Sequence, residues 1–294
     1  MITNKQKSKI REAVQAYRAN FKTQTQCAAA LEIDKAQYTE AIVNGKLDKV
    51  IADDVWMRIA MRLKVQINDL PTWKIAPTKV YIYLTEQFKM CQAESMCGLF
   101  CDRADIGKTI AAEDYAAKNP NAVVVDCSQY KTKRRLIKEI ARQFGLNTGG
   151  VYWDMWEDLV WFINNADHPF IILDEAGDMA YETFLEVKGL WNATKYRCGW
   201  FMLGADALRV KIENGMNLKR VGFEEMFSRY GAKFQRCIGE GEDATTEEDM
   251  QLQAALIAKL NAPRGANIHS LVARSEGSLR RLWGEIVKLQ RTQA

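Results

Sequence analysis

The chain has 294 residues, which is long enough for one large domain and a smaller one with a sizeable core. It has no apolar run of about 18 residues, and its first residues, Met-Ile-Thr-Asn-Lys-Gln-Lys, are too polar for a signal peptide. We therefore expect a cytoplasmic protein that does not bind a membrane. Seven cysteines at irregular spacings, with no Cys-x-x-Cys pair, favour reduced, buried thiols over a metal site.

The excess positive charge lies at the amino-terminal end. Residues 1–77 hold 13 Lys and Arg against 8 Asp and Glu, whereas the rest of the chain holds 28 against 29. A positive charge concentrated on so short a segment suits a polyanionic partner.

Residues 1–70 are predicted to form an all-α domain of short helices. Apolar positions at helical spacing favour helices over residues 5–17 and 52–63. Between them, two short helices over 24–31 and 35–43 flank a turn at Glu32-Ile33-Asp34. Asn44-Gly45 ends the second of these helices.

This region resembles a known DNA-binding motif. The stretch Gln26–Gly45, with its three consecutive alanines, is similar to the helix-turn-helix of phage-repressor-type domains, and Glu32 stands where those turns usually have glycine. The resemblance implies that Lys35, Gln37 and Tyr38 face DNA from the second helix. The alternative is a small helical bundle that docks another protein.

After a linker and lead-in helix over residues 71–95, the pattern alternates strands with helices from residue 96 to 240. Apolar runs predict strands over 96–101, 122–127, 170–173, 199–203 and 232–238. Strands separated by helices imply an α/β fold with a parallel sheet covered on both faces. One helix carries Trp153, Trp156, Leu159, Val160 and Ile163, a stripe that we expect to face the core.

A phosphate-binding loop is predicted between the first strand and the helix over residues 108–118. Residues 102–109 follow the pattern G-x-x-x-x-G-K-[ST], except that Asp102 stands at the first glycine. In such loops the lysine holds the β- and γ-phosphates and the hydroxyl binds Mg²⁺. We therefore expect ATP to lie at this helix N-terminus, against Asp105, Ile106, Gly107, Lys108, Thr109 and Ile110.

Two carboxylates close the third predicted strand. Asp174 and Glu175 follow the apolar run Phe170–Leu173, the form of a buried parallel strand that delivers Asp174 to Mg²⁺ and Glu175 to an attacking water. Thr109 and Asp174 are thus the expected metal ligands and Glu175 a catalytic residue, with ATP and Mg²⁺ as cofactors. The alternative is a strand-to-helix turn in which Gly-Lys-Thr occurs by chance.

The two aspartates of the loop are unusual beside a polyphosphate. The carboxylates of Asp102 and Asp105 would repel the phosphates unless they point outward or are paired, for example with Arg103.

The tail, residues 241–294, is predicted to be helical throughout, with helices over 247–261, 269–274 and 278–291. A compact helical lid after an α/β core is the arrangement of the AAA+ ATPases. Gly277-Ser278-Leu279-Arg280 resembles their sensor-2 turn, which implies that Arg280 reaches back to the nucleotide. Ser275 or Ser278 is the expected cap of the last helix.

Taken together, a helix-turn-helix arm, a P-loop core and a helical lid resemble the AAA+ ATPase of the Mu B transposition protein (target-DNA activator) family. The resemblance implies that Phe227-Ser228-Arg229 carries an arginine finger, which places Arg229 against the γ-phosphate of a neighbouring subunit. Arg220 and Arg236 are rivals, and an ordinary surface arginine is the alternative.

The same resemblance implies a DNA channel lined by Lys131, Thr132, Lys133, Arg134 and Arg135. Such a cluster contacts phosphates, so duplex DNA would be bound largely without regard to sequence. A solvated basic surface is the alternative.

The expected function is ATP-dependent assembly of a helical filament on duplex DNA, which selects target DNA and recruits or activates a transposase. Two other classes stay open. One is a helicase-loader or remodelling AAA+ ATPase, and the other is a non-hydrolysing DNA-binding regulator whose Asp102 and Asp105 weaken nucleotide binding.

Overall fold

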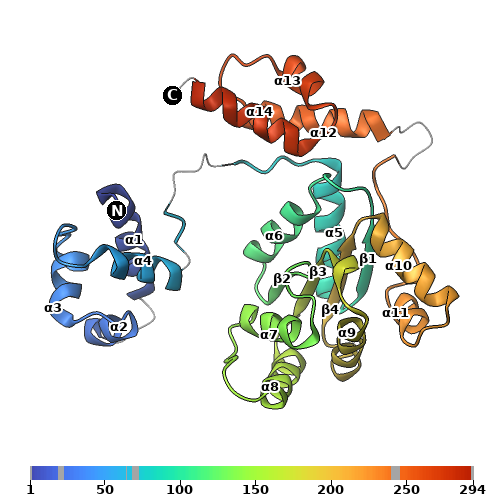
Figure 1. Ribbon diagram of the computed structural model, residues 1–294, viewed down its shortest axis with the longest axis horizontal. Coiled ribbons are helices and arrows are strands. Elements are labelled where there is room, and N and C mark those ends of the chain that lie inside the picture. Colours follow the sequence, from blue (N-terminus) through green and yellow to red (C-terminus); the bar gives the residue numbers. More distant parts are fainter. Residues whose placement is uncertain (1, 19–22, 64, 68–72, 240–245, 293–294) are drawn as a thin grey trace. The chain divides into compact units, whose positions relative to one another are not determined.

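The computed structural model describes residues 2–18, 23–63, 65–67, 73–239 and 246–292. The chain divides into two compact units, Met1–Thr72 and Trp73–Ala294; their elements are labelled in Figure 1. No helix in the described ranges is both long and apolar enough to cross a membrane.

The first unit is helical. Its elements are α1 (Asn4–Tyr17), α2 (Gln24–Ala30), α3 (Lys35–Tyr38), a π-helical turn (Thr39–Val43) and α4 (Asp53–Arg62). Thr3 and Thr23 begin α1 and α2 with capping boxes, and the Asp34 carboxylate accepts the Gln37 N–H at the start of α3. These helices enclose a core that includes Ile10, Val14, Tyr38, Trp56 and Ile59.

The turn between α2 and α3 places Glu32 in the left-handed region, with φ +58°. Glycine adopts this backbone conformation most easily, which is why glycine is usual at this point of a helix-turn-helix. The Glu32 carboxylate lies 3.6 Å from the guanidinium of Arg58 and 3.3 Å from that of Arg62 on α4. The turn therefore forms without its glycine.

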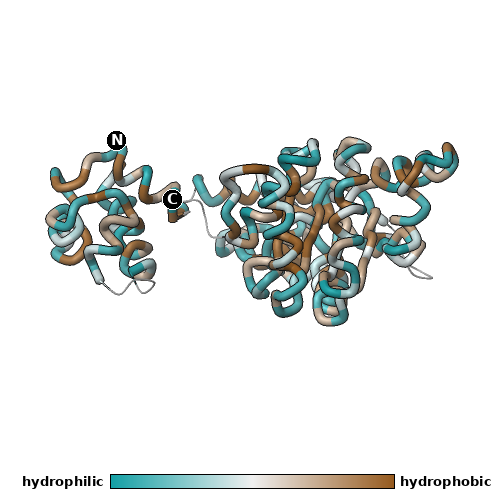
Figure 2. Tube along the Cα trace, turned by 90° about the horizontal axis from the view of Figure 1, so that it is seen from below, coloured by the Kyte–Doolittle hydropathy of each residue, from teal (hydrophilic) through white to brown (hydrophobic). Residues whose placement is uncertain are grey.

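The second unit is built on one parallel sheet. Strands β1 (Cys97–Cys101), β2 (Ala122–Asp126), β3 (Phe170–Asp174) and β4 (Gly199–Gly204) are arranged in the order β1-β4-β3-β2. Every residue of the two central strands is buried, as parallel strands covered on both faces require. In Figure 2 these strands form the brown, hydrophobic interior of the unit.

Helices cover both faces of this sheet, and the strand side chains alternate between two cores. Helices α5 (Lys79–Ala93) and α6 (Lys108–Lys118) pack against Phe100, Phe170, Ile172 and Phe201. The other face is covered by α7 (Lys133–Gln143), α8 (Tyr152–Asn165), α9 (Tyr181–Ala193), α10 (Asp206–Asn217) and α11 (Phe223–Arg229). The predicted α/β fold is confirmed.

The carboxyl-terminal helices form a separate small core. Helices α12 (Thr246–Asn261), α13 (Ile268–Ser275) and α14 (Leu279–Thr292) pack around Ala254, Ala258, Leu271, Leu282 and Ile286. The Asn261 side chain also accepts the Lys74 N–H and donates to the Lys74 carbonyl, at 2.7 and 2.9 Å. These bonds hold the segment before α5 against the lid.

Two expectations about this unit were wrong. The predicted fifth strand over 232–238 makes only one parallel bridge, between Gln235 and Phe100. Its ladder stops there because the next N–H groups, those of Cys237 and Ile238, donate to the Asp102 carboxylate. Trp153 is 63% exposed and is not a core residue; Met155, Leu159 and Ile163 form the buried face of α8.

All seven cysteines are free; six are buried and Cys97 is half-buried. Burial raises the pKa of Cys91 and Cys101 to about 12, so both stay protonated thiols at neutral pH. Their role as small hydrophobic residues fits this environment.

Candidate nucleotide-binding site

The loop between β1 and α6 has the conformation of a phosphate-binding loop. Gly107 immediately precedes α6 with φ +94°, a conformation that strains any side chain. Lys108 is 6% exposed, and its Nζ donates to the carbonyl oxygens of Asp102 and Arg103 at 3.1 and 2.7 Å. The ammonium therefore lies inside the curve of the loop, where burial lowers its pKa.

The end of β3 meets the start of α6 next to this lysine. The Thr109 hydroxyl donates to Asp174 Oδ2 at 2.6 Å, and the Glu175 N–H donates to Asp174 Oδ1 at 3.0 Å. Burial raises the pKa of the Asp174 carboxyl and that of Glu175. The structure thus brings Lys108, Thr109, Asp174 and Glu175 together as predicted.

The hydroxyl and carboxylate of this pair suit a magnesium ion. Mg²⁺ prefers oxygen ligands and is usually held by one or two protein groups together with phosphate oxygens and water. In the described part of the chain, no group of three or more His, Cys, Asp or Glu side chains could hold a metal by itself. Thr109 and Asp174 offer two oxygen ligands side by side, which fits an ion whose other ligands are phosphate oxygens and water.

A cavity of about 690 Å³ opens over the loop, within the size range of small-molecule sites. Its lining includes Gly107, Lys108, Thr109 and Glu175 of the loop and the β3 end. It also includes five apolar or aromatic residues, Trp73, Ile75, Ile257, Leu279 and Trp283. These five residues were not predicted as site residues. The signal that could have indicated one of them is Trp73, a large aromatic residue between the two prolines of the predicted linker.

The lid is attached to the phosphate loop through Asp105. The Asp105 carboxylate accepts the Ser278 hydroxyl at 2.6 Å and the Arg280 N–H at 3.1 Å, and it lies 3.8 Å from the Arg280 Nε. Ser278 in turn accepts the Arg281 N–H, so Ser278 rather than Ser275 caps α14. The negative charge of Asp105 is thus engaged by a helix N-terminus, and Arg280 lies beside the loop.

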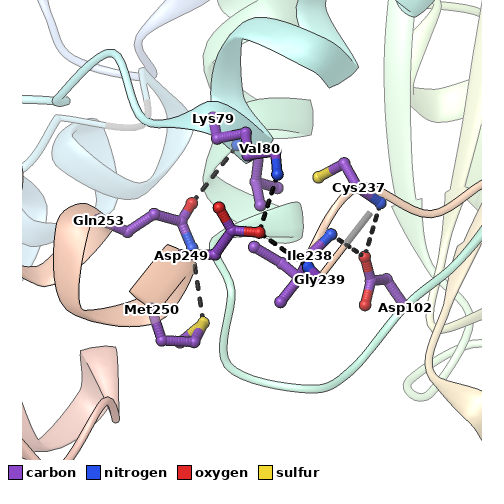
Figure 3. Close-up of polar contacts among 9 residues, drawn as sticks. All are labelled: Lys79, Val80, Asp102, Cys237, Ile238, Gly239, Asp249, Met250 and Gln253. Atoms are coloured by element: carbon purple, nitrogen blue, oxygen red, sulfur yellow. Dashed lines mark hydrogen bonds and ion pairs between the residues drawn. The ribbon is translucent and has the colours of Figure 1, made fainter. Parts of the chain in front are cut away.

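The other loop aspartate is buried. Asp102 is 0% exposed, and its carboxylate accepts the N–H groups of Arg103, Cys237 and Ile238 at 2.7, 2.9 and 3.0 Å. Backbone donors, and not the Arg103 guanidinium, therefore satisfy this carboxylate, as Figure 3 shows for Cys237 and Ile238.

The segment that Asp102 holds continues directly to a lid contact. The Gly239 N–H donates to the Asp249 carboxylate of α12 at 2.7 Å, and Lys79 of α5 pairs with the same carboxylate at 2.8 Å (Figure 3). Asp102 and Asp249 thus connect the phosphate loop, the 237–239 segment and the lid through hydrogen bonds.

The predicted arginine finger lies away from this cavity. The Arg229 guanidinium is 4.2 Å from the centre of the Trp191 ring, and Arg229 does not line the cavity of its own chain. Arg220, one of its rivals, lies over Tyr181.

The predicted DNA-contacting residues differ in exposure. Residues 131–135 are all exposed, as is Lys35, and Gln37 is half-buried with its side chain bonded to the Val50 carbonyl. Tyr38 was predicted wrongly, because it is only 2% exposed and packs in the core of the first unit. Its position in a short helix did not reveal that it fills this core.

Residues 93–231 match the family model of an AAA domain. The chain contains an AAA domain. The match runs from the end of α5 through β4 to α11, and therefore includes the phosphate loop and the acids after β3. It assigns this α/β core to the AAA-type ATPases and supports nucleotide binding there. No curated protein matches the chain.

Proposed function

We propose that this protein is an ATP-dependent DNA-binding ATPase that assembles on duplex DNA, selects it as a target, and recruits or activates a transposase. The observation that carries the proposal is the exposed basic stretch Lys131–Arg135. It follows β2, whereas the phosphate loop follows β1, and parallel strands end at the same edge of a sheet. Three strand spacings separate β1 from β2, or about 14 Å.

The basic stretch is also bonded to the segment that follows Glu175. The Lys131 carbonyl accepts the Thr183 hydroxyl at 2.6 Å and the Ala180 N–H at 3.3 Å. The Lys131 ammonium lies 3.6 Å from the carboxylate of Asp178, in the 3₁₀ turn directly after Glu175. DNA that displaces Lys131 would therefore disturb the turn next to the catalytic acid, which supports DNA-stimulated hydrolysis.

The residues of the site have distinct roles in this proposal. Lys108 would hold the β- and γ-phosphates, and Thr109 and Asp174 would hold Mg²⁺, which would supply positive charge beside the phosphates. Glu175 accepts a hydrogen bond from the attacking water and orients it. Arg280 would reach the phosphates from the lid, and Trp73 and Trp283 would offer aromatic rings to the adenine base.

Self-association is the part of the proposal in which Arg229 would act. Arg229 lies over the Trp191 ring and does not line the cavity of its own chain, which is compatible with a finger that leaves Trp191 and reaches the site of a neighbouring subunit. A head-to-tail contact of this kind, if it does not close into a ring, propagates as a helical filament. The first unit, with Lys35 on its surface, adds a second contact to DNA.

Electron microscopy and sedimentation of the full chain on duplex DNA test this proposal. We expect ATP to convert small species into DNA-bound polymers. Lys108→Ala should abolish this assembly because the phosphates lose their cation, whereas Glu175→Gln should trap it because binding persists without hydrolysis. Equal behaviour of the two variants would contradict these roles.

The basic stretch has a matched control in the same chain. Lys133→Gln/Arg134→Gln/Arg135→Gln should weaken DNA binding and reduce its dependence on salt, because fewer phosphate contacts release fewer counterions. Lys195→Gln/Arg197→Gln removes two exposed cations just before β4, where the amino-terminal ends of the strands lie, opposite to the carboxyl ends that precede the basic stretch. This variant should bind DNA like the unchanged chain. Hydrolysis stimulated by a replicative helicase and not by DNA would favour the loader function instead.

A further inference from the structure

Helix α8 has an exposed face that the nucleotide site does not use. Trp153 and Trp161 are 63% and 68% exposed, two of the most exposed large apolar side chains in the described residues. Asp154, Glu157 and Asp158 are exposed between them. We call these five residues the acidic tryptophan face.

Helical spacing places the two tryptophans and Glu157 on one stripe of the helix, and Asp154 and Asp158 beside it, so that the five residues span about 140°. Trp153, Glu157 and Trp161 are four residues apart in turn, so they lie within about 80° around the axis, and the two tryptophans are about 12 Å apart along it. The opposite face, with Met155, Leu159 and Ile163, is packed in the core. Folding of α8 therefore does not require the exposed tryptophans.

Among the residues that the structure describes, the acids of this face have no ion-pair partner. None of the carboxylates of Asp154, Glu157 and Asp158 makes a salt bridge or side-chain hydrogen bond to any residue that the structure describes. Most other acids on the lid and core helices do, for example Glu139 with Arg142 and Glu225 with Lys188. The rings of Tyr152 and Trp153 meet edge to face, with 5.4 Å between their centres. Because Trp153 is still 63% exposed, most of its indole remains open to a partner.

We propose that the acidic tryptophan face is a docking surface for an arginine-rich segment of a partner protein. Tryptophan is the aromatic ring that attracts a cation most strongly, and the carboxylates beside it pair with the same cation. Arginine fits both groups better than lysine, because its planar guanidinium stacks on a ring while it donates in pairs to a carboxylate. Tryptophan and arginine are also both enriched among the residues that contribute most of the binding energy in protein interfaces.

The probe is a fluorescein-labelled peptide of alternating arginine and alanine, titrated into the full chain and followed by anisotropy. Trp153→Ala/Trp161→Ala should weaken binding by about 5- to 30-fold, the loss of two cation–π contacts. Asp154→Asn/Glu157→Gln/Asp158→Asn should weaken binding and reduce its salt dependence. A lysine–alanine peptide should bind less tightly than the arginine peptide.

Matched variants separate this face from general surface charge. Tyr196→Ala removes an aromatic ring that is 79% exposed elsewhere, and Glu182→Gln/Glu224→Gln removes two exposed acids. Both should bind the peptide like the unchanged chain. Equal affinity of the tryptophan variant and the unchanged chain would overturn the proposal.

Sedimentation of the same variants tests whether a second copy of the chain, and not a partner protein, binds the acidic tryptophan face. If the unchanged chain dimerises without DNA or nucleotide, and Trp153→Ala/Trp161→Ala alone makes it monomeric, the face joins two copies and the proposal is wrong. The peptide titration needs neither ATP nor DNA, so its failure is distinguishable from a failure of the proposed ATPase function.

Discussion

Replacement of Asp102 by glycine, the residue that phosphate-binding loops usually have at this position, is expected to destabilise the protein. The buried carboxylate accepts three backbone N–H groups, and glycine would leave all three without a partner. Each orphaned buried donor costs about 1 to 3 kcal/mol, and water entering the vacated space recovers part of this. We therefore expect a loss of about 3 to 5 kcal/mol in the free energy of unfolding.

Scanning calorimetry of the full chain measures this loss. For a unit of this size, 1 kcal/mol corresponds to about 2 to 4 °C, so the transition of the second unit should shift down by about 6 to 20 °C. Asp102→Asn should have an intermediate effect, because its amide keeps one acceptor oxygen but turns an NH₂ group towards a backbone donor.

Asp126 provides the control for this prediction. It ends the parallel strand β2, is half-buried, and accepts the Ser128 N–H at 2.9 Å and the Gln129 side chain at 2.8 Å. Water can replace its carboxylate, so Asp126→Gly should cost less than Asp102→Gly. Equal unfolding temperatures for the two variants would refute the role assigned to Asp102.

Three further predictions concern separate parts of the chain. Trp283→Ala should lower ATP affinity at least about 5-fold in a competition assay with a fluorescent nucleotide, because base stacking contributes about 1 to 3 kcal/mol; an effect no larger than that of Trp161→Ala would contradict this. Burial raises the pKa of Glu175, so as pH falls the rate of phosphate release should begin to drop at a pH above the ordinary glutamate range. The contribution of Glu175 to the free energy of unfolding should decline as pH rises through that raised pKa. If Glu175→Gln has the same dependence of stability on pH as the unchanged chain, this prediction is wrong. Glu32→Gly should change the free energy of unfolding, measured in urea, by less than about 1 kcal/mol, because relief of the left-handed backbone offsets the lost exposed ion pairs; a larger loss would mean that those pairs matter more than the backbone.

The sequence was sufficient to predict those parts of the site that consist of two adjacent residues in one element. Lys108 and Thr109 lie at the start of one helix, and Asp174 and Glu175 at the end of one strand. Their convergence follows from parallel strands that end at one sheet edge. The helix bounds near them were predictable for the same reason, since α6 begins at the lysine and ends at Lys118 as expected.

The roles of the two loop aspartates were not predictable, because their partners are far away in sequence. Asp102 bonds to residues 135 and 136 positions later, and Asp105 to residues 173 and 175 positions later. The sequence marks both as departures from the usual loop, and only the fold shows which donors satisfy them. The failure of residues 232–238 to form the predicted fifth strand has the same cause, because Cys237 and Ile238 donate to Asp102.

Helix α8 and Tyr38 show the limit of hydrophobic periodicity. In α8 two faces carry aromatic residues, and spacing alone does not say which face meets the sheet. Tyr38 lies in a helix of four residues, too short for a periodic signal. No element was predicted over α10 and α11, where short apolar runs alternate with charges.

Phosphate release from ATP and Mg²⁺, measured with and without duplex DNA, tests most directly the claim that the Lys108–Asp174 site and the basic stretch 131–135 work together. We predict steady release that DNA increases, that Lys108→Ala abolishes, and that loses its DNA response when Lys133, Arg134 and Arg135 become glutamine. No release above that of Lys108→Ala, or release that DNA leaves unchanged, would contradict the claim.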